Sequence, residues 1–409
     1  MTVIDAWVKQ KTAEGNRRAE QILDRFEKDY IGTDGYNNFG YNALMNAYAR
    51  TEDGATAKVE ALFERMQQLA SEHNNPGLLP DKLSYSSLML SLTHEGRRGY
   101  ADKVDALLKE MEDSPDESVQ PDLIAYSVAL DAWSKSGEAH AAERARAIPS
   151  RMTGPVRPST VCFNCLMNIY ATEGKAEEAE SVLEMMDRES RAGNPRTKPR
   201  STDFATCINA WAKSDRLSEC WERSSQLFNT MMDRYKAGND QCKPQQRAIT
   251  PMFMALANSS ETHKAQKALG VIRELESAGI QHNRITCNAL IHALSTESGD
   301  EKAKKDALKL SLATFELLRG GSLRSSPDSA TYNSMMHACL NLMVANPEEQ
   351  ATLFEQVFQL CCNDGKVNSI VLSSMKRAFP NSKLLAVVNG TSEIGIDDVP
   401  NSWKRKTEN

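Results

Sequence analysis

The 409-residue sequence has no long hydrophobic run, and its most apolar stretches resemble the five residues 384–388. A membrane-spanning helix needs about 20 apolar residues, so the sequence excludes one. Basic residues do not predominate either, because 49 Lys and Arg stand against 55 Asp and Glu, a net charge of −6. This balance argues against nucleic-acid binding through overall charge and leaves a local basic stripe as the only electrostatic route.

The motifs of common chemistries are also missing. The seven histidines form no His-Glu-x-x-His, no glycine-rich phosphate loop occurs, and neither half of the zinc deaminase signature is present. Cys162 and Cys165 form a lone Cys-x-x-Cys without a second pair at zinc-site spacing. We therefore predict a non-enzyme with no catalytic residue, no metal and no cofactor.

The nine cysteines are an odd number scattered through apolar segments, which predicts reduced thiols in an intracellular or organellar compartment. Residues 1–7 enter an amphipathic pattern at once, so we expect no targeting peptide within this chain.

What the sequence does contain is an internal repeat. An aromatic or apolar residue is followed by a mostly small or polar residue and then an apolar run, at intervals of 44, 41, 37, 41, 45, 38 and 45 residues. A period of this size indicates a repeat array. The eight copies begin this motif at Tyr41, Tyr85, Tyr126, Phe163, Phe204, Ile249, Cys287 and Tyr332.

Each copy reads as two helices with apolar residues three and four apart, the second ending near a methionine such as Met66 or Met111. Pro80-Asp81 and similar pairs then stop the copy. A helix pair buries both its apolar faces only by stacking on neighbours, which predicts an all-α, right-handed superhelical solenoid. We divide the chain into an N-terminal cap at 1–37, repeats at 38–81, 82–122, 123–159, 160–200, 201–245, 246–283, 284–328 and 329–368, capping helices at 369–390, and a loose tail at 391–409.

This pattern resembles the pentatricopeptide repeat family, of the plain kind without an appended catalytic domain. Tetratricopeptide repeats are the close rival, but their Trp falls early in the first helix, whereas Trp133 and Trp211 fall late here. The resemblance implies binding of single-stranded RNA, one base per repeat, along the first helices.

The resemblance also implies which residues read the bases: the residue after the motif's first residue, here called the reader, and the residue that closes the copy. The pairs would be Asn42 with Asp81, Ser86 with Asp122, Ser127 with Ser159, Asn164 with Arg200, Ala205 with Gln245, Thr250 with Asn283, Asn288 with Asp328, and Asn333 with Asn368. By the family's code the array would prefer 5′-UGNNNAUC, with three loosely specified central positions.

Two further sets accompany the readers. Three residues before the reader, five copies carry a residue that resembles the family's wedge against base faces: Phe39, Leu83, Ile124, Val161 and Ile285. Eight residues after it, basic residues could contact phosphates: Arg50, Lys135 and Lys213, with Lys9 in the truncated first copy.

Simpler interpretations stay open at this point. The readers could be helix N-caps, Pro-Asp could be a helix stop with a turn residue, and the basic residues could complement helix dipoles. The alternative function is a protein-binding scaffold. The family resemblance implies a monomer acting in a mitochondrion, or alternatively a plastid, with organellar processing or ribosomal proteins as possible partners.

Overall fold

The computed structural model describes residues 2–31, 33, 35–51, 55–152, 156–281, 283–321, 325–378 and 399–404. These residues form helices and connecting turns and contain no strand, so the prediction of an all-α protein is confirmed. None of the helices described is both long and apolar enough to cross a membrane. Most of the segment 379–409, including most of the predicted tail, lies outside the described residues.

The helices alternate between a first and a second helix of each pair. The first helices are α1 (Thr2–Val8), α3 (Phe39–Thr51), α5 (Lys82–Glu95), α7 (Leu123–Ser136), α9 (Thr160–Thr172), α11 (Ser201–Lys213), α13 (Gln246–Asn258), α15 (Arg284–Ser295), α17 (Ser329–Leu342) and α19 (Ser369–Ala378). The second helices are α2 (Ala13–Tyr30), α4 (Thr56–Glu72), α6 (Tyr100–Asp113), α8 (Ala141–Arg151), α10 (Ala176–Arg191), α12 (Cys220–Lys236), α14 (Lys264–Ser277), α16 (Glu301–Arg319) and α18 (Pro347–Asn363). A short helix, α21 (Asn401–Lys404), follows near the C-terminus.

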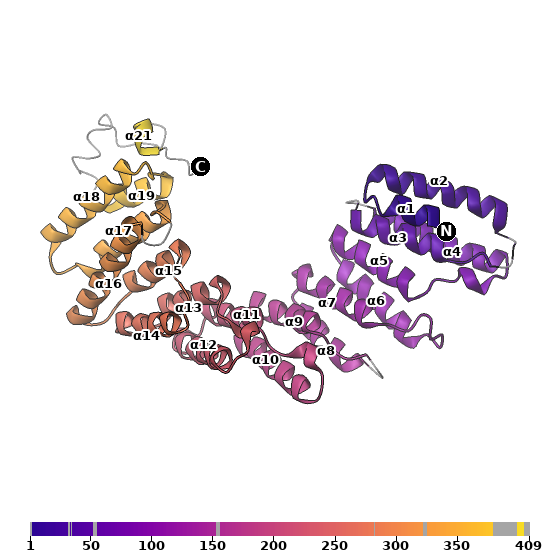
Figure 1. Ribbon diagram of the computed structural model, residues 1–409, viewed down its shortest axis with the longest axis horizontal. Coiled ribbons are helices and arrows are strands. Elements are labelled where there is room, and N and C mark those ends of the chain that lie inside the picture. Colours follow the sequence, from indigo (N-terminus) through magenta and orange to yellow (C-terminus); the bar gives the residue numbers. More distant parts are fainter. Residues whose placement is uncertain are drawn as a thin grey trace. The chain divides into compact units, whose positions relative to one another are not determined.

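The chain forms two compact units, and each stacks its first helices directly on one another. Unit 1 comprises Met1–Glu173 and Glu184–Lys198, and unit 2 comprises Gly174–Leu183 and Pro199–Asn409. In unit 1, α3 packs on α5, α5 on α7 and α7 on α9; in unit 2, α11, α13, α15, α17 and α19 form the same kind of row (Figure 1). Each unit therefore presents one continuous wall of first helices.

The first helices begin earlier than the motif suggested, and in several copies the side chain of the residue that closes the copy caps the next helix. Asp81 and Asp122 accept hydrogen bonds from backbone N–H groups at the starts of α5 and α7, and Asp328 does the same for α17. Free N–H groups at a helix start favour such an acceptor. The readers themselves lie inside the helices, so the interpretation of the readers as N-caps is wrong.

The core lies between the first and second helices and holds the residues that the apolar pattern marked. Met66, Met111, Trp133 and Trp211 are all buried. All nine cysteines are free and buried, and burial raises the pKa of the Cys165 thiol to about 12.

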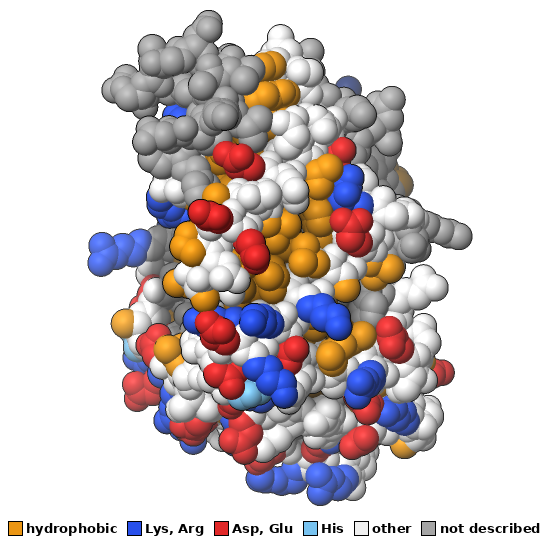
Figure 2. Space-filling model, turned by 90° about the vertical axis from the view of Figure 1, so that its left-hand side faces the viewer, with side chains coloured by type: hydrophobic (Ala, Val, Ile, Leu, Met, Phe, Trp, Pro, Cys, Tyr) orange, Lys and Arg blue, Asp and Glu red, His pale blue; other side chains and the backbone are white. Residues whose placement is uncertain are grey.

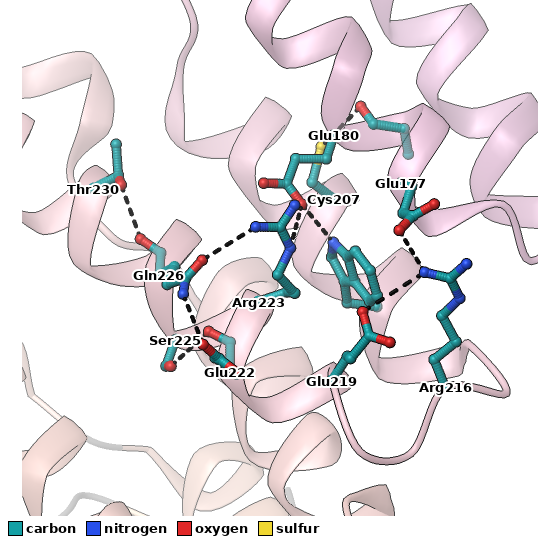
Figure 3. A network of polar contacts seen from close by, with 12 residues as sticks. Glu177, Glu180, Cys207, Arg216, Glu219, Glu222, Arg223, Ser225, Gln226 and Thr230 are labelled. Carbon is teal, nitrogen blue, oxygen red and sulfur yellow. Dashed lines mark hydrogen bonds and ion pairs between the residues drawn. The ribbon is translucent and has the colours of Figure 1, made fainter.

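A polar network explains why the first half of α10 belongs to unit 2. Glu180 of α10 accepts a hydrogen bond from Trp211 Nε1 at 2.9 Å and lies 3.5 Å from Arg223 Nε of α12. Glu177, one turn earlier, pairs with Arg216 in the loop before α12 (Figure 3). These contacts bind α10 to α11 and α12, on the side of α10 that carries its acidic residues.

Candidate functional site

The readers occupy one equivalent position on successive first helices. Each lies one turn into its helix, and within each unit the following copy's first helix packs beside it. This register follows from the helical period, because residues three and four apart share a face. The structure therefore places Asn42, Ser86, Ser127 and Asn164 along the wall of unit 1, and Ala205, Thr250, Asn288 and Asn333 along the wall of unit 2.

The two Asn–Asp copies have the same hydrogen-bonded arrangement. Asn42 Nδ2 donates to Asp81 Oδ1 at 3.1 Å, and Asn42 Oδ1 accepts from Ser84 Oγ at 2.5 Å. Asn288 Nδ2 donates to Asp328 Oδ1 at 3.0 Å, and Asn288 Oδ1 accepts from Thr331 Oγ1 at 2.6 Å. The capping carboxylate and the hydroxyl three residues after it fix the orientation of the reader's amide.

This arrangement leaves each amide with hydrogen-bonding capacity to spare. An amide has two N–H donors and two acceptor lone pairs, and only part of this set is used by Asp and Ser or Thr.

The residue four positions before the reader reinforces the carboxylate. Asn38 Nδ2 donates to Asp81 Oδ2 at 3.2 Å, and Arg284 Nε lies 3.1 Å from Asp328 Oδ2. Burial alone would raise the pKa of Asp328, but hydrogen bonds from Thr331 and Asn288 and the charge of Arg284 hold that pKa below its usual value. Asp328 is therefore a stable acceptor at neutral pH.

In two other copies the reader bonds to a residue other than the one that closes the copy. Thr250 Oγ1 accepts from Gln246 Nε2 at 2.7 Å, and Gln246 Oε1 accepts from Thr286 Oγ1, which also bonds to Asn283. In the last copy, Asn333 Oδ1 accepts from Ser374 Oγ at 2.8 Å, while Asn368 caps α19 through Val371 N.

The middle copies are less well organised. Ser127 Oγ donates to the carbonyl of Leu123 in its own helix at 2.6 Å. Cys162, which stands where Ser84 stands in the first copy, has its thiol 3.5 Å from Ser127 Oγ and 3.6 Å from Ser159 Oγ. Asn164 Oδ1 is buried and has no hydrogen-bond partner among the described residues. Ala205 offers no polar group, and Arg200 is drawn onto Asp203 of its own helix.

Ser86 and Asp122 form no hydrogen bond with each other among the described residues. Ser86 is buried, and Asp122 Oδ1 accepts only from the backbone of Ile124 and Ala125. The residue three after Asp122 is Ala125, so this copy lacks the hydroxyl that bridges the Asn–Asp copies.

All five predicted wedge residues are exposed on the wall. Their exposed fractions run from 44% for Phe39 to 59% for Ile124, with Leu83, Val161 and Ile285 between them. Large apolar side chains at one repeated, solvent-facing position are unusual for a core and typical of a binding surface. The sequence analysis did not name Ile370, which is 61% exposed at the same position of α19, with Ser373 as the corresponding reader.

The predicted basic residues lie at or just beyond the ends of their first helices and are all exposed. Arg50 Nε donates to Asn46 Oδ1 at 2.8 Å, and Lys135 Nζ donates to Asp131 Oδ2 at 2.7 Å. In both cases the partner lies four residues after the reader. Lys213 ends α11, and Lys9 follows α1.

In other copies the same position binds the neighbouring helix instead. Asn341 Nδ2 donates to the carbonyl of Ser295 at 3.0 Å, and Asn258 Nδ2 to that of Ala212 at 2.7 Å. Thr296 and His94 make the equivalent bonds to Ala257 and Ala49. The last carbonyls of a helix lack partners within it, so these side chains satisfy them and join adjacent first helices.

Charge on the surface is mixed rather than of one sign. Figure 2 shows acidic and basic side chains interspersed over the lower part of one face, with hydrophobic side chains gathered near its centre. Only local rows of basic residues could therefore contact an anionic ligand.

One group of possible metal ligands occurs among the described residues. His140 Nε2 lies 3.2 Å from Glu138 Oε2 and 3.9 Å from Asp102 Oδ1. These side chains reach solvent and form surface ion pairs, and we assign them no role.

Comparisons with known proteins identify the repeat. The family model described as PPR repeat matches residues 161–190, and that described as pentatricopeptide repeat domain matches residues 270–342. A pentatricopeptide repeat-containing protein of Arabidopsis thaliana is 21% identical, over 64% of this chain and 48% of its own length. A second from that plant, named as mitochondrial, is 26% identical over 45% and 47%.

A third Arabidopsis thaliana relative, the small ribosomal subunit protein mL103 (rPPR7), is 24% identical over 58% of this chain and 57% of its own length. The chain thus spans about half the length of these relatives. Among solved structures, the maize pentatricopeptide repeat protein PPR10 aligns with 92% of this chain and 55% of its own, at 16% identity and a TM-score of 0.43.

Proposed function

Because the chain carries pentatricopeptide repeats, we propose that it is a sequence-selective single-stranded RNA-binding protein that takes one base per repeat. One observation carries this proposal: five exposed apolar residues stand at the same position of the first helices α3, α5, α7, α9 and α15, one turn before a polar reader. A base stacked between neighbouring wedges would present its edge to the reader.

The proposed preference is 5′-UGNNNAUC, read along the eight repeats in the division given above. The two Asn–Asp copies, at the first and seventh positions, support the two U assignments, because their amides are oriented and keep a donor and an acceptor. The unspecified centre is supported by Ser127, whose hydroxyl is used within its own helix, and by Ala205.

We further propose that the protein acts without catalysis, by occupying a site on organellar transcripts. A covered segment neither pairs with other RNA nor is cut, which is sufficient for stabilisation, processing or translational control. The mitochondrial name of one relative and the ribosomal name of mL103 support an organelle, and the latter makes ribosomal proteins a class of partner to test.

The experiment is selection of a random single-stranded RNA pool on the purified protein at near-physiological salt. The expected result is enrichment of U-G, three loose positions and A-U-C, with affinity that falls as salt rises. Enrichment of another motif would reject the register. No enrichment and no salt-sensitive binding would reject RNA binding and favour the protein scaffold.

A further inference from the structure

The wall of unit 2 carries basic residues at a position where the wall of unit 1 carries none. Four residues after the reader, α15 has His292, α17 has His337, and α19 has Arg377. The equivalent residues in α3, α5, α7 and α9 are Asn46, Leu90, Asp131 and Asn168.

The basic residue stands eight residues after the reader in α3 and α7, but four residues after it in α15 and α17. In α3 and α7 the later position is basic and the earlier one, Asn46 or Asp131, is its acceptor. In α15 and α17 the later position is Thr296 or Asn341, which is used to bind the preceding helix. The basic group then stands at the earlier position.

We propose that His292, His337 and Arg377 form a second phosphate-contacting row, which binds the RNA backbone along the last three first helices. The inference rests on the proposed RNA-binding function. Four residues correspond to about 6 Å along a helix, so the backbone would run about one turn closer to the readers here than in the copies of Arg50 and Lys135.

The three side chains are close enough to act on one another electrostatically. Partial burial and the charges of Arg377 and His292 lower the pKa of His337. Partial burial and the charge of Lys264 likewise lower the pKa of His292. At neutral pH the two imidazoles are therefore mostly neutral and can donate N–H hydrogen bonds, and Arg377 carries the fixed charge of the row.

A buried lysine, Lys264, acts electrostatically on His292, although burial lowers the pKa of the lysine itself and the charge of Glu297 opposes that lowering. Lys264 is 1% exposed, and its Nζ lies within 3.2 Å of the carbonyls of Ala257 and Ser259 and 2.8 Å from Thr296 Oγ1. Three acceptors match the three N–H bonds of an ammonium group, so the site fits the charged form. Its nearest carboxylate, Glu297, accepts hydrogen bonds from the backbone of Lys264 and Gly299.

The test combines a protein variant with a shortened RNA. Arg377→Gln and the double variant His292→Gln/His337→Gln are compared with the wild type on 5′-UGNNNAUCN and on 5′-UGNNNA, which lacks the last three nucleotides. On the longer RNA we expect each variant to weaken binding several-fold, and Arg377→Gln to reduce the salt slope by about 0.7. On the shorter RNA neither variant should change affinity.

Two control variants make the result specific. Arg273→Gln removes an exposed charge from the second helix α14 and should leave affinity and slope unchanged. Arg50→Gln should weaken binding to both RNAs equally. The second row is rejected if Arg377→Gln behaves like Arg273→Gln, or if it weakens both RNAs alike. A wild type without salt-sensitive RNA binding would reject the proposed function and the row with it.

Discussion

The two units build the same wall from the same register, but use its positions differently. Unit 1 places exposed basic residues, Arg50 and Lys135, eight residues after the reader in two of its copies. In unit 2 that position is basic in α11, at Lys213, but Asn258, Thr296 and Asn341 hold it in the next three copies and hydrogen-bond the preceding helix, as His94 does in unit 1. A repeat position is therefore either a surface for a ligand or a contact between repeats, because one side chain cannot do both.

Substitutions of the tryptophans near the ends of α7 and α11 should give the largest difference in stability between the two units. Trp133 in unit 1 and Trp211 in unit 2 hold the same position, but Trp133 Nε1 has no hydrogen-bond partner among the described residues, whereas Trp211 Nε1 donates to Glu180. Either Trp→Ala change should cost about 3–5 kcal/mol of stability. Trp211→Phe should then cost about 1 kcal/mol more than Trp133→Phe, since only Trp211 loses a hydrogen bond.

Urea unfolding followed by circular dichroism measures all four variants. Equal losses for the two Trp→Phe variants would show that the bond to Glu180 contributes nothing net. Arg223→Gln, which removes the other partner of Glu180 but keeps the indole, serves as the matched control for this network.

A change of reader should alter base preference without abolishing binding. Asn288→Thr is expected to shift the preference of its copy from U toward G, by roughly tenfold for a difference of 1.4 kcal/mol. Asn42→Thr should do the same at the first position. Selection from an RNA pool randomised at one position measures both.

Asn168→Thr changes the same wall at a position away from any reader and should leave the preference unaltered. If Asn288→Thr gives the wild-type profile, the register of unit 2 is wrong; a shift in only one of the two copies would mean that the units read RNA by different rules.

Because one repeat position is used in two ways, substitutions at it should affect either protein stability or RNA binding, but not both. Asn341→Ala should destabilise the protein by about 1 kcal/mol, because it leaves the carbonyl of Ser295 without its donor, and should affect RNA affinity little. Arg50→Ala should hardly change stability, yet reduce the salt slope of RNA binding by about 0.7. Thermal unfolding and filter binding separate the two effects, and a variant that changes both equally would contradict the division of roles.

The smallest expected effect is a pH dependence in unit 2. The pKa of Asp328 is lowered in the folded protein, so its carboxylate stabilises the fold above the unfolded pKa near 4, and this stabilisation is lost as pH falls through the folded value. Asp328→Asn, which keeps a good N-cap residue, should flatten this part of the stability profile. Unfolding midpoints between pH 6 and pH 3 test this, and a variant as pH-sensitive as the wild type would contradict it.

Much of the site could be predicted from local pattern alone. The exposure of Ile124 and the place of Asn288 on the same wall follow from spacing along single helices, where residues three and four apart share a face, whereas their roles as wedge and reader are what the family resemblance implies. The bridging hydroxyl of Ser84 and the supporting Asn38 could not be predicted, because their roles depend on contacts with residues about 40 positions away. The same spacing would have predicted Ile370 as an exposed apolar residue, but it lies beyond the eight copies that the motif defined.

The sequence by itself determined the repeat, the helix pairs and the row of exposed apolar residues, because each is a periodic feature of one short segment. Only the tertiary structure decided which polar residues remain available to a ligand. Stacking brings the end of one first helix beside the next helix in the row. Asn341 and Thr296 hydrogen-bond the unpaired carbonyls at the end of the preceding helix and are therefore not available to a ligand, whereas Arg50 and Lys135 remain exposed. Contacts between neighbouring copies decide which of these residues stay available, so the sequence of a single copy cannot predict it.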